Sequence, residues 1–297
     1  MSRKKVIITI PAYNEEATIA STLEELKAVM KPLPYAWEIQ VVSDGSTDNT
    51  ASIAKKHQAS VIVFKTNRGL AKTFQSEIGF CLQKKADIIV HTDADGQYPA
   101  AAIPEMLKKI EEGNDLILGS RFLASRSYKN EFSRKLGNKV FAKVISRLIG
   151  KPITDSTTGF RAFTRDVAAN IQFINNFTYT QEQIIKAARQ GFKIAEVAIE
   201  ARVTRKSKLF HNPLQYAIKA WLNIFRIYRD YDPLKFFGAI GGFLFSLGAL
   251  IGLYFVYLHL SGGIQGHLGL LFLMITLLST GLQIISFGFL ADMQRRD

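Results

Sequence analysis

The sequence predicts an α/β protein with a mainly parallel sheet, followed by an amphipathic helix and two membrane-spanning helices. Three observations lead to this prediction. Over the first two-thirds of the 297-residue chain, short β-rich runs alternate with segments of helical periodicity. Polar, turn-forming motifs directly follow several of these runs, and the last part of the chain is strongly apolar. Strands that alternate with helices are typical of βαβ units, which have parallel strands and right-handed crossovers.

The elements of the soluble part are expected in a regular order. Runs rich in Val, Ile and aromatic residues predict the strands, and apolar residues three and four apart predict the helices. The predicted strands are 6–10, 37–42, 61–64, 88–91 and 116–118, and the predicted helices are 15–30, 50–57, 70–82 and 101–110. A basic amphipathic helix over 130–149, and a helix followed by a strand over 177–199, complete this part.

Two long segments near the end of the sequence contain no Asp, Glu, Lys or Arg. They are residues 236–260 and 268–291, and each exceeds the roughly 20 apolar residues that cross a bilayer core. Two buried helices of a large soluble core are the alternative, but such helices usually carry a polar stripe. Basic residues stand outside both segments: Arg226, Arg229 and Lys235 on one side, and Arg295 and Arg296 on the other. The positive-inside rule therefore predicts an integral membrane protein with the soluble domain and both termini in the cytoplasm.

The residues before the first span predict a further membrane element. Within 211–232, Trp and Tyr side chains and apolar residues recur at helical spacing, which favours an amphipathic helix in the headgroup region. A helix packed on the soluble domain is the alternative. The predicted organisation is thus a soluble domain over 1–210, an interfacial helix over 211–232 and a transmembrane hairpin over 233–297. Two glycine pairs are spaced for close contact between the spans: Gly238 with Gly242, and Gly248 with Gly252.

The formal net charge of +13 indicates an anionic partner. This partner could be nucleic acid, an acidic lipid surface or a phosphorylated substrate. The positive charge collects near the membrane-facing segments and no nucleic-acid recognition module is present, so we expect a lipid bilayer and no nucleic acid as partner. The sequence also lacks G-x-G-x-x-G and G-x-x-x-x-G-K-[ST], which argues against a dinucleotide oxidoreductase and a P-loop NTPase.

The motif "DADGQ" after the strand 88–91 predicts a metal site. Asp93 and Asp95 are two residues apart, so in an extended segment both carboxylates project to the same side, and Gln97 continues the series. Mg²⁺ and Mn²⁺ prefer such oxygen ligands, and Mg²⁺ typically combines one or two carboxylates with substrate phosphates. A solvated turn is the alternative for a lone D-x-D.

Two other polar loops follow predicted strands, "PAYNEE" after the first and "SDGSTD" after the second. Open parallel sheets bind ligands beyond the carboxyl ends of their strands, so Asp44, Tyr13 and Glu15 are expected at the same edge as the D-x-D. Tyr13 and Glu15 are candidates for lining a base pocket. The alternatives are that Glu15 only complements a helix N-terminus and that "SDGSTD" is only a capping turn, which suits Asp48 better than Asp44.

Five motifs in this order, "PAYNEE", "SDGSTDNT", "DADGQYP", "GSRF" and "DSTTGFRAF", resemble those of the family 2 glycosyltransferases. The similarity to the dolichyl- and polyprenyl-phosphate sugar synthases of that family extends through essentially the whole chain. It implies a GT-A (Rossmann-like) fold, a nucleotide-sugar donor (UDP- or GDP-linked), a Mg²⁺ or Mn²⁺ ion, and transfer with inversion to a polyprenyl or dolichyl phosphate at the cytoplasmic membrane face.

The resemblance also implies roles for individual residues. Pro11, Tyr13, Glu15, Asp44 and Asp93 would bind the nucleotide, and Asp93, Asp95 and Gln97 would hold the metal and the donor diphosphate. Arg202, Ser207 and Lys208 in "RVTRKSKL" would close over that diphosphate, although this chain has Arg205 where the family has Gly. Arg121 and Arg134 would bind the acceptor phosphate. Asp93, Asp95 and Asp155 would form the catalytic group, and Asp155 would act either as a base or by orienting the sugar and balancing the arginines.

Two other functions compete with this interpretation. A membrane-tethered nucleotide-sugar binder without catalysis would share the pocket, but Asp93, Asp95 and Asp155 are all present. A processive polysaccharide synthase would share the D-x-D, but neither Trp37 nor Trp221 stands in a Q-x-x-R-W motif. The identity of the sugar, the base of the donor and the formation of a homo-oligomer are left open by the sequence.

Overall fold

The computed structural model describes residues 3–123, 132–171, 179–202, 222, 225–226, 229–261 and 266–294, of which 132–137 are described as backbone only. The chain divides into two compact units, Met1–Pro213 and Leu214–Asp297. Each unit is described by itself.

The first unit contains a seven-stranded sheet in the order β3-β2-β1-β4-β6-β5-β7. Six of its strands are parallel, and β6 runs antiparallel between β4 and β5. The strands are β1 (Lys5–Ala12), β2 (Ala36–Asp44), β3 (Ser60–Phe64), β4 (Ile88–His91), β5 (Leu116–Ser120), β6 (Arg161–Thr164) and β7 (Ile194–Ala198). The predicted mainly parallel sheet is confirmed.

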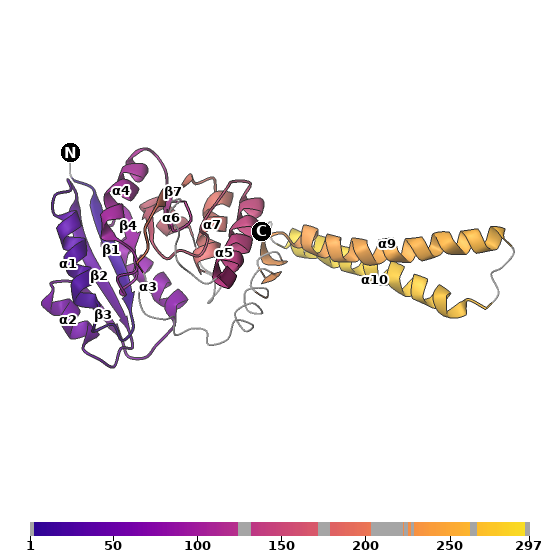
Figure 1. Ribbon diagram of the computed structural model, residues 1–297, viewed down its shortest axis with the longest axis horizontal. Coiled ribbons are helices and arrows are strands. Elements are labelled where there is room, and N and C mark those ends of the chain that lie inside the picture. The colour runs from indigo at the N-terminus through magenta and orange to yellow at the C-terminus, as the bar shows by residue number, and fades with distance from the viewer. Residues whose placement is uncertain are drawn as a thin grey trace. The chain divides into compact units, whose positions relative to one another are not determined.

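Helices lie on both faces of this sheet (Figure 1). Alternate residues of β1 point to opposite faces: Val6, Ile8 and Ile10 join the core cluster that also contains buried residues of α1, α2 and α4. The other face receives α3, whose Phe74 and Cys81 are fully buried. The helices are α1 (Ile19–Met30), α2 (Thr50–Lys56), α3 (Leu70–Gln83), α4 (Ile103–Glu111), α5 (Phe132–Ile149), α6 (Arg165–Asn170) and α7 (Tyr179–Arg189), with a short 3₁₀ turn, η1 (Ala100–Ala102).

Strand direction brings the polar loops to one edge of the sheet. Because β1, β2, β4, β5 and β7 are parallel, the segments that follow them leave the sheet on the same side. The reversed strand β6 begins at this edge, since its first residue, Arg161, pairs with His91 at the end of β4. The loop that contains Asp155 therefore enters the sheet where the other loops leave it.

Two local features differ from the sequence prediction. The first helix begins at Ile19 rather than near Glu15, because the carbonyl oxygen of Glu15 accepts N–H bonds from Thr18 and Ile19 in a preceding turn. Sequence periodicity also did not identify β6, which has four residues. Its sequence, RAFT, lacks the continuous apolar run from which the equally short strand 88–91 was predicted.

The second unit contains two long apolar helices, α9 (Pro233–Leu260) and α10 (Leu268–Met293). Both are long and apolar enough to cross a membrane, with mean hydropathies of 2.0 and 2.1. Their large side chains are mostly exposed, for example Phe243, Leu253 and Phe272. The two predicted spans are therefore present as helices. The interfacial helix predicted over 211–232 lies largely outside the described residues.

Glycines set the contact between α9 and α10. Gly241 and Gly248 on α9, and Gly281 and Gly288 on α10, are the glycines buried in the hairpin. A Cβ at Gly241 would lie 2.5 Å from the carbonyl oxygen of Gly281, so the two backbones touch. The residues in each pair are seven apart, a spacing that keeps them on one face of a helix.

This arrangement corrects one of the two predicted glycine pairs. A Cβ added to Gly238 or Gly242 would have no neighbour within 4 Å, so these two glycines do not form the contact. Gly248 does contact α10, where an added Cβ would lie 3.0 Å from Leu278, and a Cβ at Gly252 would lie 3.3 Å from Met274. The predicted pair Gly248 and Gly252 therefore lies against α10, whereas the four-residue spacing of Gly238 and Gly242 does not mark a buried face.

The adjacent positions Gly241 and Gly242 provide a matched test of the hairpin. Both substitutions to Ala add one methyl group and gain similar helix propensity, up to about 1 kcal/mol. Gly241→Ala forces the backbones apart and should lower the free energy of unfolding by about 1–3 kcal/mol, whereas Gly242→Ala should be neutral or stabilising. Thermal unfolding in detergent, followed by the helical circular dichroism signal, measures both. Equal midpoints for the two variants would contradict the observed packing.

Candidate functional site

The loop after β4 presents the predicted metal ligands. The backbone N–H of Gln97 donates to Oδ1 of Asp95 at 3.0 Å, which closes a tight turn between the two residues. The backbone N–H of Arg202, beyond β7, donates to the carbonyl oxygen of Gln97 at 2.8 Å. The segment that follows β7 therefore lies against this turn.

The environment of Asp93 disfavours its negative charge. Burial raises the pKa of Asp93 to about 6; the positive charges of His91 and Arg121 oppose the shift, and the carboxylates of Asp95 and Glu15 add to it. These influences show that Arg121 and Glu15, from two other loops, lie near the carboxyl group. A site that raises a carboxyl pKa in this way is one in which a bound cation would offset an unfavourable charge.

Gly159 lies directly against Asp93. A Cβ on Gly159 would be 3.3 Å from Oδ1 of Asp93, so the absence of a side chain gives the carboxylate its space. The carbonyl oxygen of Gly159 contacts Nδ1 of His91 at 2.8 Å, and its N–H donates to the hydroxyl of Tyr98 at 3.2 Å. Both bonds hold this glycine in place.

A buried ion pair supports the other side of His91. Its Nε2 lies 3.3 Å from Oε2 of Glu77 on α3, and both side chains are fully buried. Burial lowers the pKa of His91, but the Glu77 carboxylate, together with the Asp93 charge and the Gly159 carbonyl, more than offsets this effect and raises the pKa overall. Removing one member of such a pair leaves an uncompensated buried charge, at a cost of about 3–5 kcal/mol. The pair thus anchors β4 behind the D-x-D loop.

The side chains of this loop suit a hard divalent cation. Within the described ranges, no three carboxylate, imidazole or thiolate side chains gather into a metal site. The donors available are the carboxylates of Asp93 and Asp95 and the amide oxygen of Gln97, which leaves room for phosphate oxygens. This is the pattern in which Mg²⁺ uses one or two carboxylates together with substrate phosphates. The residues therefore fit the implied Mg²⁺ or Mn²⁺ ion.

The Asp44 carboxylate binds the backbone of the neighbouring 66–69 segment. Its Oδ1 accepts the backbone N–H of Arg68 at 2.8 Å, and its Oδ2 accepts that of Gly69 at 3.0 Å. Gly45 follows with φ +70°, and a Cβ there would lie 2.4 Å from the nitrogen of Asn67. Only glycine fits this position, where the 66–69 segment crosses the turn. The predicted nucleoside contact of Asp44 would use the lone pairs that remain on its oxygens.

The loop after β1 places the other predicted nucleoside contacts beside this turn. Pro11 is buried at the end of β1, and Tyr13 is 46% exposed. Glu15 is buried, and its backbone N–H donates to the Thr50 hydroxyl at 2.8 Å. The exposed ring of Tyr13 is thus available for stacking on a flat ligand.

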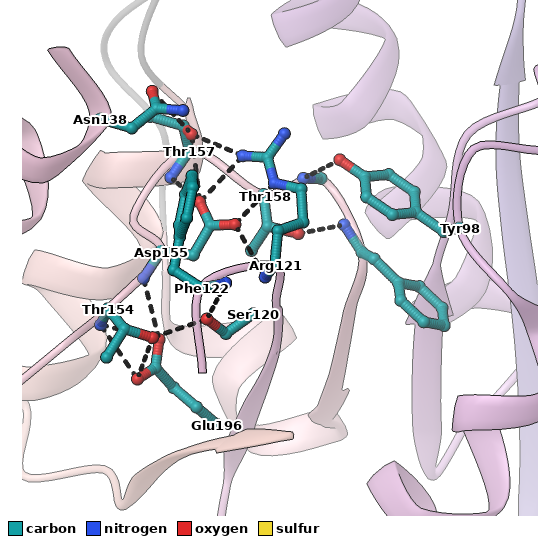
Figure 2. A network of polar contacts seen from close by, with 12 residues as sticks. Tyr98, Ser120, Arg121, Phe122, Asn138, Thr154, Asp155, Thr157, Thr158 and Glu196 are labelled. Carbon is teal, nitrogen blue, oxygen red and sulfur yellow. Dashed lines mark hydrogen bonds and ion pairs between the residues drawn. The ribbon is translucent and has the colours of Figure 1, made fainter. Parts of the chain in front are cut away.

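Arg121 and Asp155 form a bidentate ion pair (Figure 2). Arg121 Nε donates to Oδ2 of Asp155 at 2.7 Å, and the terminal Nη2 donates to Oδ1 at 2.9 Å. The same Nη2 donates to the hydroxyl of Thr157 at 2.8 Å. Asp155 is fully buried and the Arg121 side chain is 12% exposed. The carboxylate also accepts the backbone N–H groups of Arg121 and Thr157 and the Thr157 hydroxyl, so its oxygens are held from several sides.

Several residues that hold the site were not singled out from the sequence. Arg161 is fully buried and donates to the carbonyl oxygens of Thr158 and Thr180 and to Oε1 of Gln183. Burial lowers its pKa to about 10, so it stays charged at neutral pH. Glu196 on β7 accepts bonds from Thr154 and Asp155. Arg161 lies within the motif "DSTTGFRAF" but was not assigned a role there, and Glu196 lies in the strand predicted before residue 199 and outside the polar motifs.

The other predicted residues are described only in part. The guanidinium of Arg202 forms two bonds to Glu25 on α1, of 2.6 and 2.9 Å, so in this structure it faces α1 rather than the D-x-D carboxylates. Arg134 lies on α5, but its side chain is outside the described residues, as are Ser207 and Lys208.

Comparisons with known proteins show what this chain is similar to. The model of the family "Glycosyl transferase family 2" matches residues 7–172. The chain is 31% identical over 195 residues to a dolichyl-phosphate hexose transferase of Haloferax volcanii, covering 66% of this chain and 82% of that protein. It is 27% identical to an undecaprenyl-phosphate 4-deoxy-4-formamido-L-arabinose transferase of Serratia proteamaculans, covering 97% of this chain and 88% of that protein.

The fold is also found in solved structures. The glucosyl-3-phosphoglycerate synthase of Mycobacterium tuberculosis, crystallised with Mn²⁺, UDP and glucosyl-3-phosphoglycerate, superimposes with a TM-score of 0.59 at 20% identity, covering 75% of this chain and 80% of that one. This likeness confirms the predicted GT-A fold. The family match over residues 7–172 and the 31% identity to the Haloferax protein show that the chain is a glycosyltransferase and belongs to glycosyl transferase family 2.

Proposed function

We propose that this protein transfers a sugar, with inversion, from a nucleotide-sugar to a polyprenyl or dolichyl phosphate at the cytoplasmic face of a membrane. The observation that carries the proposal is the juxtaposition of the D-x-D carboxylates with the buried Arg121–Asp155 pair, in a chain with two helices able to span a bilayer. The relatives of Haloferax and Serratia are named for transfer to dolichyl and undecaprenyl phosphate. Both names support a lipid phosphate as the acceptor.

The donor would lie along the loops after β1, β2 and β4. Tyr13, Glu15 and Asp44 would border the nucleoside, with Pro11 beneath them, and Asp93, Asp95 and Gln97 would hold the cation beside the diphosphate. A bound Mg²⁺ or Mn²⁺ would neutralise the charge that develops on the departing nucleoside diphosphate. Arg202 would leave Glu25 and bind the diphosphate. Ser207 and Lys208 would bind the same diphosphate.

The acceptor would meet the donor at Arg121. One oxygen of its phosphate attacks the anomeric carbon as the bond from that carbon to the diphosphate oxygen breaks. A phosphate monoester has its second pKa near ~6, so it is largely dianionic at neutral pH and needs no strong base. Asp155 already accepts five hydrogen bonds. We infer that it fixes the Arg121 guanidinium, and that Arg134 supplies a second cation for the phosphate.

The proposed position of the soluble unit at the membrane surface is based on its exposed basic residues. Lys139, Lys143 and Arg147 lie exposed at four-residue intervals along α5, opposite its buried residues Phe141 and Ile145. A row of this kind suits an acidic lipid surface. The basic residues that flank the two spans favour a cytoplasmic soluble unit and cytoplasmic termini.

A donor panel tests the proposed reaction. Purified full-length protein in nanodiscs, with Mg²⁺ or Mn²⁺ and polyprenyl phosphate, should convert the lipid phosphate to a glycolipid with at least one UDP- or GDP-sugar. Product is measured by mass spectrometry. EDTA should abolish turnover, and so should Asp95→Asn, which removes a charged ligand without changing shape. Asp166→Asn, at an exposed position of α6, is the control and should retain activity. Unconverted lipid across the whole panel would leave only the nucleotide-sugar binder.

Gly159→Ala tests the cation site without replacing a ligand. The added methyl group would press on the Asp93 carboxylate at 3.3 Å, so Mn²⁺ affinity in the presence of nucleoside diphosphate should fall roughly tenfold, which corresponds to about 1.4 kcal/mol. Isothermal titration calorimetry measures this affinity.

Gly79→Ala on α3, where nothing lies within 4 Å of the added carbon, is the matched control and should bind Mn²⁺ like the wild type. Unchanged affinity in Gly159→Ala would remove Asp93 from the proposed cation site.

A further inference from the structure

Glu196 binds the backbone of the loop that carries Asp155. Its Oε1 accepts the N–H groups of Thr154 at 3.0 Å and Asp155 at 3.1 Å. Its Oε2 accepts the Thr154 N–H at 3.0 Å and the Thr154 hydroxyl at 2.9 Å. Figure 2 shows this carboxylate below the Arg121–Asp155 pair. One side chain of β7 therefore holds two consecutive residues of another loop.

The partners of Glu196 are all neutral. In the described part of the chain, no Lys, Arg or His side chain lies within ion-pair distance of it. Its hydrogen bonds go to peptide N–H groups and one hydroxyl. Hydrogen bonds to an ionised acceptor are roughly twice as strong as neutral ones. The arrangement fixes a loop rather than balancing a nearby cation.

Hydrogen bonds through the hydroxyl groups of Thr154 and Ser120 connect Glu196 to both sequence neighbours of Arg121. The Thr154 hydroxyl donates its hydrogen to Glu196, so the short 2.6 Å contact between Ser120 Oγ and Thr154 Oγ1 has Ser120 as donor. Ser120 Oγ in turn accepts the N–H of Phe122 at 3.2 Å. Ser120 and Phe122 flank Arg121 in the sequence, so Glu196 reaches the backbone on each side of this arginine.

Arg121 is thus held by two routes that start at the same carboxylate. The first passes through the Asp155 N–H to the Asp155 side chain and the bidentate ion pair. The second passes through Thr154 and Ser120 to the backbone around Arg121. We propose that Glu196 is a positioning residue, which sets the orientation of the Arg121 guanidinium toward the acceptor phosphate without touching either substrate. This inference rests on the proposed function, in which Arg121 binds that phosphate.

The test compares the KM for the acceptor with the KM for the donor. Glu196→Gln keeps the size of the side chain and removes its charge. Because the bonds to an ionised acceptor are roughly twice as strong as neutral ones, the variant should hold the Asp155 loop less firmly, and the acceptor KM should rise roughly tenfold while the donor KM stays near that of the wild type. Glu200→Gln, the same substitution at an exposed position four residues further on, is the control and should change neither KM. An acceptor KM unchanged in Glu196→Gln, or a donor KM raised equally, would overturn the proposal.

A double-mutant cycle tests whether the effect passes through Arg121. If it does, Glu196→Gln should add little to the acceptor KM of Arg121→Lys, because residues that act on one interaction are not additive. Full additivity of the two effects would show that Glu196 acts elsewhere. Thr154→Val removes only the hydroxyl link and should raise the acceptor KM in the same direction by less, which provides a readout if Glu196→Gln folds poorly. An unchanged KM in that variant would exclude the hydroxyl route.

Activity of the wild-type protein distinguishes failure of the proposed function from failure of the proposed role of Glu196. Absence of wild-type turnover with every donor would overturn both the proposed function and the role of Glu196. Wild-type turnover with an unaffected Glu196→Gln variant would overturn the role of Glu196 alone.

Discussion

The bidentate pair between Arg121 and Asp155 is the interaction on which the site depends. Its members come from the end of β5 and from the loop before β6, strands that run in opposite directions. A buried carboxylate and a guanidinium stabilise each other only when both remain in place, and loss of either leaves a charge that costs about 3–5 kcal/mol. The pair therefore ties the two loops together and keeps a cation beside the D-x-D turn.

Much of the fold could be predicted because its elements are strongly periodic. The five strands and four helices expected from sequence periodicity are present with small changes at their ends. The convergence of the loops that carry Tyr13, Asp44 and Asp93 followed from the parallel sheet alone, since successive parallel strands end on one side. The structure confirms that β1, β2 and β4 are neighbours, which brings the first three polar motifs together.

The remaining features depend on contacts between residues far apart in the chain, which local patterns do not record. Nothing in the short run of β6 reveals that it is reversed, yet this reversal brings Asp155 to the site. Glu196 and Arg161 hold loops through backbone groups, and any segment can offer such groups. One of the two predicted glycine pairs was misassigned because the four-residue and seven-residue spacings are both present in the same helix, and only the packing distinguishes them.

The loop before β6 serves both ends of the site. Asp155 holds the arginine proposed for the acceptor, and Gly159, four residues later, gives room to the carboxylate proposed for the donor cation. The five consecutive residues from Asp155 to Gly159 thus connect the proposed acceptor site to the proposed cation site. In the proposed reaction, a displacement at either end of this segment would be transmitted through a few peptide bonds, which would couple the binding of one substrate to that of the other. An enzyme built in this way has a physical basis for ordered binding.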